Sequence, residues 1–365
     1  MDLESERKKY KKGLKAPTQK EIDLWSYDFA LFSANIKKFF PKIKNSEYFN
    51  LFKNCLYNKW TSSIEQYDLT YLRNTSIINH SSIDLNPKVE NQPIIFTSFH
   101  YGSYRLFNST LYELGYKVVI IMDEGVIKRQ GNEMLNEVIP SLKGTKDSDF
   151  IILNVKDRTS IFKLKKLISK GYVMSVYLDG NMGINDDNKS FSKGYIPINL
   201  FNNTVYVKNG IGKLASILGA MLIPTISYKD TNENNHLTFY KEIQINDFKN
   251  KREFSIKSIE LVYEIFFDLL KKDPMQWSSW LDIHLWFKRD FTTPSKNIFL
   301  DKKNEKFNSE RYTFFKKAES FFLFDLFDYK SYPITEELHL QIKQNRFSEI
   351  QPNLFTDLKT KNIIL

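Results

Sequence analysis

Two short polar segments follow apolar runs in the sequence, and each carries a side chain suited to proton transfer. His100 lies in the segment Phe99–Arg105 (FHYGSYR), directly after the apolar run 93–99. Asp179 follows a second apolar run, 172–178. A histidine at a strand-to-helix junction is placed to act as a general base, because its ring can face a crevice while the backbone stays fixed. Position alone leaves open the alternative that the histidine only caps the following helix.

Apolar runs alternate with amphipathic segments through the middle of the chain. The runs, rich in β-branched and aromatic residues, predict buried parallel strands over 93–99, 117–122, 150–153, 172–178 and 222–228. The amphipathic segments predict helices over 104–114, 126–138, 159–169, 210–218 and 255–271. This alternation predicts an α/β fold with a mostly parallel central sheet flanked by helices. Ligands of such sheets bind beyond the carboxyl ends of the strands, where both polar segments lie.

The two ends of the chain differ from this α/β region. Thr18 and Glu21 form a capping box at the start of the helical stretch 18–60. The charged segment 301–312 is typical of a linker, and residues 320–345 predict a hairpin followed by a helix. The predicted division is an N-terminal helical region (1–90), an α/β domain (91–290), and a linker with a small C-terminal hairpin-helix unit (291–365).

The composition is that of a folded basic protein. The 365 residues include 53 Lys and Arg against 43 Asp and Glu, a formal net charge of +10. This excess suggests an anionic partner, such as an acidic carrier protein or anionic lipid head groups, although general use of lysine for solubility explains it equally well. Zinc-finger spacing and RNA-recognition strings are missing from the sequence, so we expect no nucleic-acid partner. The single cysteine, Cys55, excludes an internal disulfide framework.

The sequence also bears on location and on metals. No apolar run reaches the roughly 18 residues of a membrane span, and the charged segment 1–15 lacks the apolar core of a signal peptide. We therefore expect a cytoplasmic protein, with peripheral contact to the inner face of the membrane as an option. The remaining histidines show no metal-ligand spacing, so we expect no metal site.

Four segments, found in order along the chain, resemble the motif blocks of one superfamily. They are Ile94–Leu106 with Val118–Met122, Leu164–Gly183, Phe201–Pro224, and Asp273–Trp280 with Arg289. Over about residues 91–290 the chain resembles the lysophospholipid acyltransferase superfamily, in the style of its lipid A biosynthesis late acyltransferase branch. The resemblance implies that a fatty acyl group moves from a thioester donor, acyl carrier protein or acyl-CoA, to a hydroxyl or amine. It implies no metal and no tightly bound cofactor.

In that superfamily the catalytic histidine is followed five positions later by an acidic residue that orients it. His100 matches the histidine, but the acidic position holds Arg105. A cation cannot hold imidazole in its basic tautomer, so another carboxylate must do so if the chemistry is kept. Asp179 is the first choice because it follows a predicted neighbouring strand, and Asp123 and Glu124 are the alternatives.

The resemblance also suggests how a substrate is held. Arg105 could bind a phosphate of the donor's phosphopantetheine arm. The backbone amides of Gly102 and Ser103 could stabilise an oxyanion. We also expect an elongated apolar tunnel that leads from His100, with basic residues at its mouth. The expected substrate-binding residues are Gly102, Ser103, Tyr104, Arg105, Asp123, Glu124, Arg129 and Gly180.

The sequence does not distinguish among three kinds of acceptor: a peptide, another natural product and a lipid. The C-terminal segment Phe321–Ile342 resembles small peptide-recognition domains of ribosomal peptide maturation enzymes, which add a peptide strand to a sheet edge. An ordinary hairpin that caps a core is the alternative. For the whole protein, the alternative to an acyltransferase is a catalytically inactive relative that binds an acyl chain or a peptide.

Overall fold

The computed structural model describes residues 3–85, 92–142, 149–180, 194–288 and 305–365. The chain forms two compact units. The first comprises residues 1–10, 54–199 and 204–279, and the second comprises 11–53, 200–203 and 280–365. The boundary between them falls inside α1 (Leu3–Lys15) and inside α3 (Asn45–Glu65). His100 and Asp179 both belong to the first unit.

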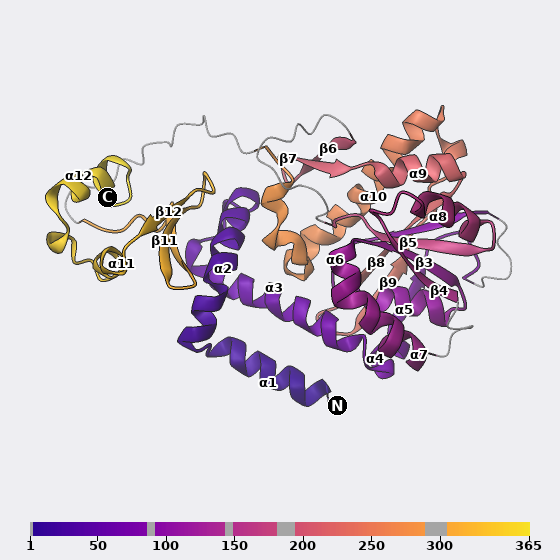
Figure 1. Ribbon diagram of the computed structural model, residues 1–365, viewed down its shortest axis with the longest axis horizontal. Helices are drawn as coiled ribbons and strands as arrows, with labels where there is room; N and C mark the ends of the chain where they lie inside the picture. Colours follow the sequence, from indigo (N-terminus) through magenta and orange to yellow (C-terminus); the bar gives the residue numbers. More distant parts are fainter. Residues whose placement is uncertain (1–2, 86–91, 143–148, 181–193, 289–304) are drawn as a thin grey trace. The chain divides into compact units, whose positions relative to one another are not determined.

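The first unit is built on a seven-stranded sheet with the strand order β1–β9–β8–β2–β5–β3–β4 (Figure 1). The strands are β1 Ser76–Asn79, β2 Ile94–Ser98, β3 Lys117–Met122, β4 Phe150–Asn154, β5 Tyr172–Tyr177, β8 Met221–Lys229 and β9 Asn235–Phe239. Neighbouring strands are parallel except β8 and β9, which are antiparallel. A separate two-stranded pair is formed by β6 (Tyr195–Leu200) and β7 (Asn203–Lys208). The prediction of an α/β fold with a mostly parallel central sheet is confirmed.

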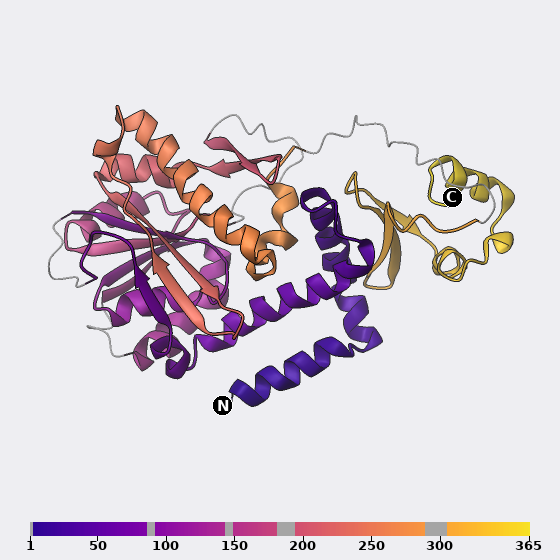
Figure 2. The same ribbon diagram turned by 180° about the vertical axis from the view of Figure 1, so that it is seen from behind.

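Helices lie on both sides of this sheet, with α9 and α10 on one side and α5 on the other (Figures 1 and 2). The helical segments of this unit are α4 Leu69–Arg73, α5 Leu106–Glu113, α6 Glu124–Val126, two π-helical turns at Ile127–Gly131 and Met134–Val138, α7 Ile139–Ser141, α8 Ser160–Ile168, α9 Gly210–Leu218 and α10 Lys251–Lys272. At Gly212 a Cβ atom would lie 2.1 Å from the carbonyl oxygen of Ser255. Only glycine at this point lets α9 and α10 approach so closely.

Two strands at one edge of the sheet were not predicted from the sequence. β1 lies in a stretch that the sequence presents as polar and mixed, and its four residues are exposed or half-buried. β9 pairs antiparallel with β8 and carries polar as well as apolar side chains. The central strand β2, in contrast, is buried at every residue. An apolar run marks a strand that is buried on both faces, so it does not mark the exposed β1 or β9, whose buried residues include polar ones.

The second unit combines α2 (Gln19–Phe39) with a three-stranded antiparallel sheet and two helices. Thr18 and Glu21 form the expected capping box on α2. The sheet has the order β10–β11–β12, and α11 and α12 follow it (Figure 1). Its elements are β10 Tyr312–Lys317, β11 Ser320–Asp325, β12 Ser331–Ile334, α11 Glu336–Lys343 and α12 Pro352–Thr360. The predicted hairpin and helix are present, and β10 is an additional strand.

Candidate active site

His100 and Asp179 meet because of the register of two neighbouring strands. β2 and β5 run parallel, and Ser98 pairs with Tyr177 at their carboxyl ends. His100 and Asp179 each follow two residues later. The His100 Nδ1 atom lies 2.7 Å from Oδ1 of Asp179, and the His100 backbone N–H donates to Oδ2 at 2.9 Å. The contact expected from sequence is present.

Asp179 is a fully buried carboxylate with several donors around it. Besides the two contacts from His100, Oδ2 accepts hydrogen bonds from Trp277 Nε1 at 2.8 Å and from Ser279 Oγ at 3.1 Å. Burial by itself raises the pKa of this carboxyl, but the nearby His100 charge and these hydrogen bonds outweigh burial and hold the pKa below its usual range. Asp179 is therefore an anion that orients the imidazole.

Trp277 and Ser279 are site residues that the sequence reading did not identify. The Trp277 side chain is fully buried. The motif resemblance of Asp273–Trp280 was the available signal, but it assigned no role to either side chain. The same segment also holds the histidine loop, because Ser278 N–H donates to the His100 carbonyl at 3.1 Å. The orienting group is thus a network contributed by three separate parts of the chain.

The imidazole of His100 is flanked by two tyrosines. The rings of Tyr104 and Tyr177 each lie with their centroids 4.7 Å from the imidazole centroid. The Tyr177 hydroxyl donates to the Tyr104 carbonyl at 2.9 Å and accepts from Asn108 Nδ2 at 3.2 Å. Burial raises the pKa of Tyr177, so its hydroxyl keeps its proton. Within the described part of the chain no residue hydrogen-bonds to the second ring nitrogen of His100, Nε2, and the side chain is 30% exposed.

Gly102 has a structural role that differs from the expected one. Its φ is +56°, and a Cβ atom would lie 2.7 Å from the Cα of Tyr228. Its backbone N–H donates to the carbonyl of Gln276 at 3.1 Å. This amide is therefore not free to stabilise an oxyanion, which corrects the expectation for Gly102. Glycine is needed here because the loop turns through a left-handed conformation against β8.

The Ser103 side chain takes part in a buried ionic network. Its hydroxyl contacts the buried carboxylate of Glu65 and the side chain of Asn235. Glu65 in turn pairs with Arg7 and with Lys229, whose Nζ lies 2.9 Å from Oε1. All of these side chains are buried, and Ser103 does not line the cavity described below. The Ser103 hydroxyl is thus held in an ionic network behind the histidine loop, whereas the expected oxyanion contact of the Ser103 backbone amide stays a prediction.

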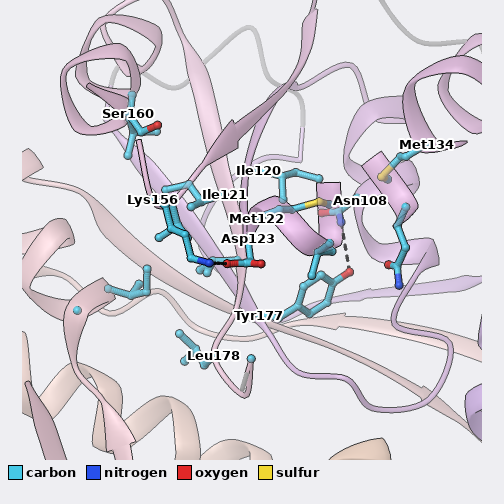
Figure 3. A pocket seen from close by; sticks show the side chains of 18 of the residues that line it. Asn108, Ile120, Ile121, Met122, Asp123, Met134, Lys156, Ser160, Tyr177 and Leu178 are labelled. Carbon is cyan, nitrogen blue, oxygen red and sulfur yellow. Dashed lines mark hydrogen bonds and ion pairs between the residues drawn. The ribbon is translucent and has the colours of Figure 1, made fainter. Parts of the chain in front are cut away.

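His100 lines a cavity of about 570 Å³. Figure 3 shows other side chains of the cavity wall, among them Tyr177 and Leu178. The walls of the cavity come from the carboxyl ends of β3 and β5, from α8 and from the start of α9, and they combine aliphatic and methionine side chains with charged and amide ones. This volume lies within the usual range for small-molecule sites. Of the expected substrate-binding residues, Tyr104, Arg105, Asp123 and Gly180 line the cavity together with His100.

Two other expected residues do not reach the cavity wall. Glu124 is exposed and pairs with Lys128 at 2.8 Å, and Arg129 is exposed on the π-helical turn. Asp123 does line the cavity, but it pairs with Lys156 at 2.9 Å instead of approaching His100 (Figure 3). Neither alternative carboxylate therefore takes the place of Asp179.

Several basic side chains line the same cavity. Arg105 Nε donates to the Tyr104 hydroxyl at 3.4 Å, and its guanidinium carbon lies 5.9 Å from the centroid of that ring. Lys208, at the end of β7, is half-buried, and burial lowers its pKa. Among the residues that the structure describes, no carboxylate forms an ion pair with Arg105, Arg158 or Lys208. Sequence reasoning missed Arg158 and Lys208 because nothing in their local sequence places them at a site.

Some expectations fall outside the described residues: Arg289 and the end of the second motif block, residues 181–183. Within the described ranges, no three His, Cys, Asp or Glu side chains are grouped closely enough to hold a metal ion. In the same ranges, no helix combines the length and the apolar character needed to cross a membrane.

Comparison with solved structures gives weak similarity. No protein-family model and no curated protein matches the chain. Among solved structures, the chain is similar to the 1-acyl-sn-glycerophosphate (LPA) acyltransferase PlsC from Thermotoga maritima, with 17% sequence identity and a TM-score of 0.32. The match covers 70% of this chain and 98% of that one. A likeness at this level supports no conclusion about activity, substrate or branch of a superfamily.

Proposed function

We propose that the protein is an acyltransferase that moves a fatty acyl group from a thioester donor to a hydroxyl or amine. The observation that carries the proposal is the pairing of His100 with the buried Asp179 at the wall of an apolar cavity. A carboxylate on Nδ1 keeps the proton on that nitrogen and leaves Nε2 as the basic atom. The site thereby contains the general base that acyl transfer needs, although Arg105 occupies the usual acidic position.

The reaction proceeds by proton transfer and substitution at the thioester carbonyl. His100 Nε2 takes the proton of the acceptor hydroxyl or amine as its oxygen or nitrogen attacks the carbonyl carbon. The tetrahedral intermediate collapses, the carbon–sulfur bond breaks, and the thiolate leaves. The imidazolium returns its proton to this thiolate, so His100 ends the cycle neutral. Asp179 stays ionised throughout and stabilises the imidazolium.

The cavity is suited to the acyl chain. Each methylene that leaves water for an apolar wall contributes about 0.8 kcal/mol, and the walls include Ile120, Leu164 and Leu214. We assign Arg105 and Lys208 to phosphate groups of the donor, because they are cations at the cavity without a described carboxylate partner. Both acyl carrier protein and acyl-CoA carry such phosphates. For the acceptor we propose a peptide or a lipid, since the C-terminal sheet and helices fit the first and the motif resemblance fits the second.

A thiol-release assay tests the base. The protein is incubated with palmitoyl-CoA and with either lysophosphatidate or a peptide that contains serine and lysine, and the acylated product is identified by mass. We expect His100→Ala to lower the rate by about 10²- to 10⁴-fold in a protein that remains folded, as its circular dichroism spectrum will show. His80→Ala is the matched control, because His80 is exposed and away from the cavity. Transfer at the same rate in both variants would refute the assignment of the base.

A second experiment tests the occupant of the cavity. Leu214 lines the cavity, whereas Ile217 on the same helix is 75% exposed. Leu214→Phe should lower the longest acyl chain that the enzyme transfers, and Ile217→Phe should leave the chain-length profile unchanged. If the wild-type protein retains palmitoyl-CoA but releases no thiol with either acceptor, the protein is an acyl-binding relative and the proposed activity is wrong.

A further inference from the structure

Residues 155–170, which lead into and through α8, carry half of the protein's net charge. They include six basic residues and one acidic residue, a net charge of +5 against +10 for the chain. Lys156 and Lys163 pair with carboxylates at 2.9 Å. The remaining four cations, among them Lys165 and Lys166, form no ion pair with any carboxylate in the described ranges. The exposed side of this segment is called the 155–170 surface below.

The same surface exposes large apolar side chains. Phe162 is 76% exposed and Ile161 is 62% exposed, both in the first turn of α8. Lys165 and Lys166 follow them by four residues, so each apolar side chain has a lysine one turn along the helix. Lysines in the last turn of a helix are favoured by the helix dipole alone. That effect does not explain why a phenylalanine and an isoleucine remain in water beside them.

The 155–170 surface adjoins the cavity. Val155, Ile161 and Leu164 line the cavity wall, and Val155 and Ile161 are also exposed on the outside. One short stretch of chain therefore carries an apolar path from the protein surface to the space beside His100. The 155–170 surface is therefore placed to contact the partner from which an apolar chain enters the cavity or to which it leaves.

We propose that the 155–170 surface docks the protein on an anionic lipid bilayer. Phe162 and Ile161 insert among the head groups, and the lysines on the next turn of α8 contact lipid phosphates. A helix with lysines beside exposed aromatic and aliphatic side chains has the composition of an interfacial membrane contact. Basic residues near an anionic leaflet add attraction that salt screens.

A bilayer fits these observations better than an acidic carrier protein does. A protein partner must offer a shaped apolar pocket to receive Phe162 and Ile161, whereas the interfacial region of a bilayer accepts apolar side chains of any arrangement. The inference does not rest on the proposed acyl transfer, because docking requires only the surface. His100→Ala should therefore bind vesicles as well as the wild-type protein, which separates the two proposals.

Sedimentation with vesicles tests the docking. The full-length protein is mixed with vesicles of phosphatidylcholine, with or without phosphatidylglycerol, at physiological ionic strength. We expect binding to the anionic vesicles only. The triple variant Lys165→Gln, Lys166→Gln, Lys170→Gln should bind about a hundredfold more weakly, at roughly fivefold per lysine. Phe162→Ser should weaken binding between about tenfold and a hundredfold.

Matched controls separate this surface from general charge and hydrophobicity. Lys8→Gln, Lys9→Gln, Lys12→Gln removes the same charge from exposed positions on α1. Leu24→Ser removes an apolar side chain that is 77% exposed on α2. Both controls should bind anionic vesicles as the wild-type protein does.

Three outcomes would overturn the proposal. The first is no binding to anionic vesicles. The second is an equal loss of binding in the α8 variants and in their controls. The third is that the protein does not bind vesicles but binds an acyl carrier protein or RNA through these lysines. That result would assign the surface to the partner that binds.

Discussion

Replacing Asp179 by asparagine changes one atom at the centre of the candidate site. In the native site Oδ2 accepts three hydrogen bonds, from the His100 N–H, Trp277 and Ser279, while Oδ1 faces His100 Nδ1. An asparagine oxygen at the Oδ2 position keeps the three donors. The amide NH₂ then faces Nδ1 and donates to it, which forces the imidazole proton onto Nε2. The atom that should remove the acceptor's proton is thereby no longer basic.

The expected loss follows from this tautomer change. Removal of a general base lowers rates by about 10²- to 10⁴-fold, equivalent to about 3 to 5 kcal/mol of transition-state stabilisation. We expect this loss in kcat with little change in KM, because Asp179 is buried behind the imidazole and does not line the cavity. The thiol-release assay with palmitoyl-CoA measures both constants. A kcat within about threefold of the wild-type value would refute the role of Asp179 as the orienting group.

The same variant has a defined effect on stability. The pKa of Asp179 is held below its ordinary value of 3.8 in the folded protein. A group whose pKa is lowered by folding stabilises the protein above its unfolded pKa, and this stabilisation is lost as the pH falls through the folded pKa. Asp179→Asn should therefore unfold more easily than the wild-type protein at neutral pH. In urea titrations the difference should shrink below about pH 4, and a difference that grows there would contradict the assignment.

Two further predictions concern packing and buried charge. Glu65→Ala leaves two buried cations without their counter-charge and should lower the unfolding free energy by about 3 to 5 kcal/mol. The control Glu47→Ala, at an exposed position on the same helix, should lower the unfolding free energy by less than about 0.5 kcal/mol. Urea denaturation measures both values. Gly212→Ala places a methyl group 2.1 Å from a backbone oxygen of α10 and should cost about 1 to 3 kcal/mol. A Cβ atom at Gly210 in the same helix would meet no atom within 4 Å, so the melting temperature of Gly210→Ala should stay near that of the wild type. Equal losses of stability in both glycine variants would contradict the close packing of α9 on α10.

The parallel strands could be predicted from sequence because strands buried on both faces have an apolar local composition. β2 and β5 are covered on both faces, so nearly every residue in them must be apolar or small. The same runs indicate where each strand ends, and hence that His100 and Asp179 lie at carboxyl ends. The hairpin of β11 and β12 was predictable for a similar reason, since its alternation and its turn are close in sequence.

The neighbours of each strand, and everything that depends on them, were decided by tertiary packing. Nothing in the runs themselves states that β5 lies between β2 and β3, yet this order brings Asp179 to His100. Trp277 and Ser279 reach the same carboxylate from about a hundred residues further along the chain. The amide of Gly102 and the hydroxyl of Ser103 are held by partners that no local pattern identifies. Local composition determined which segments are buried and what chemistry they carry, whereas contacts distant in sequence decided which side chains meet, because those contacts depend on how whole elements pack.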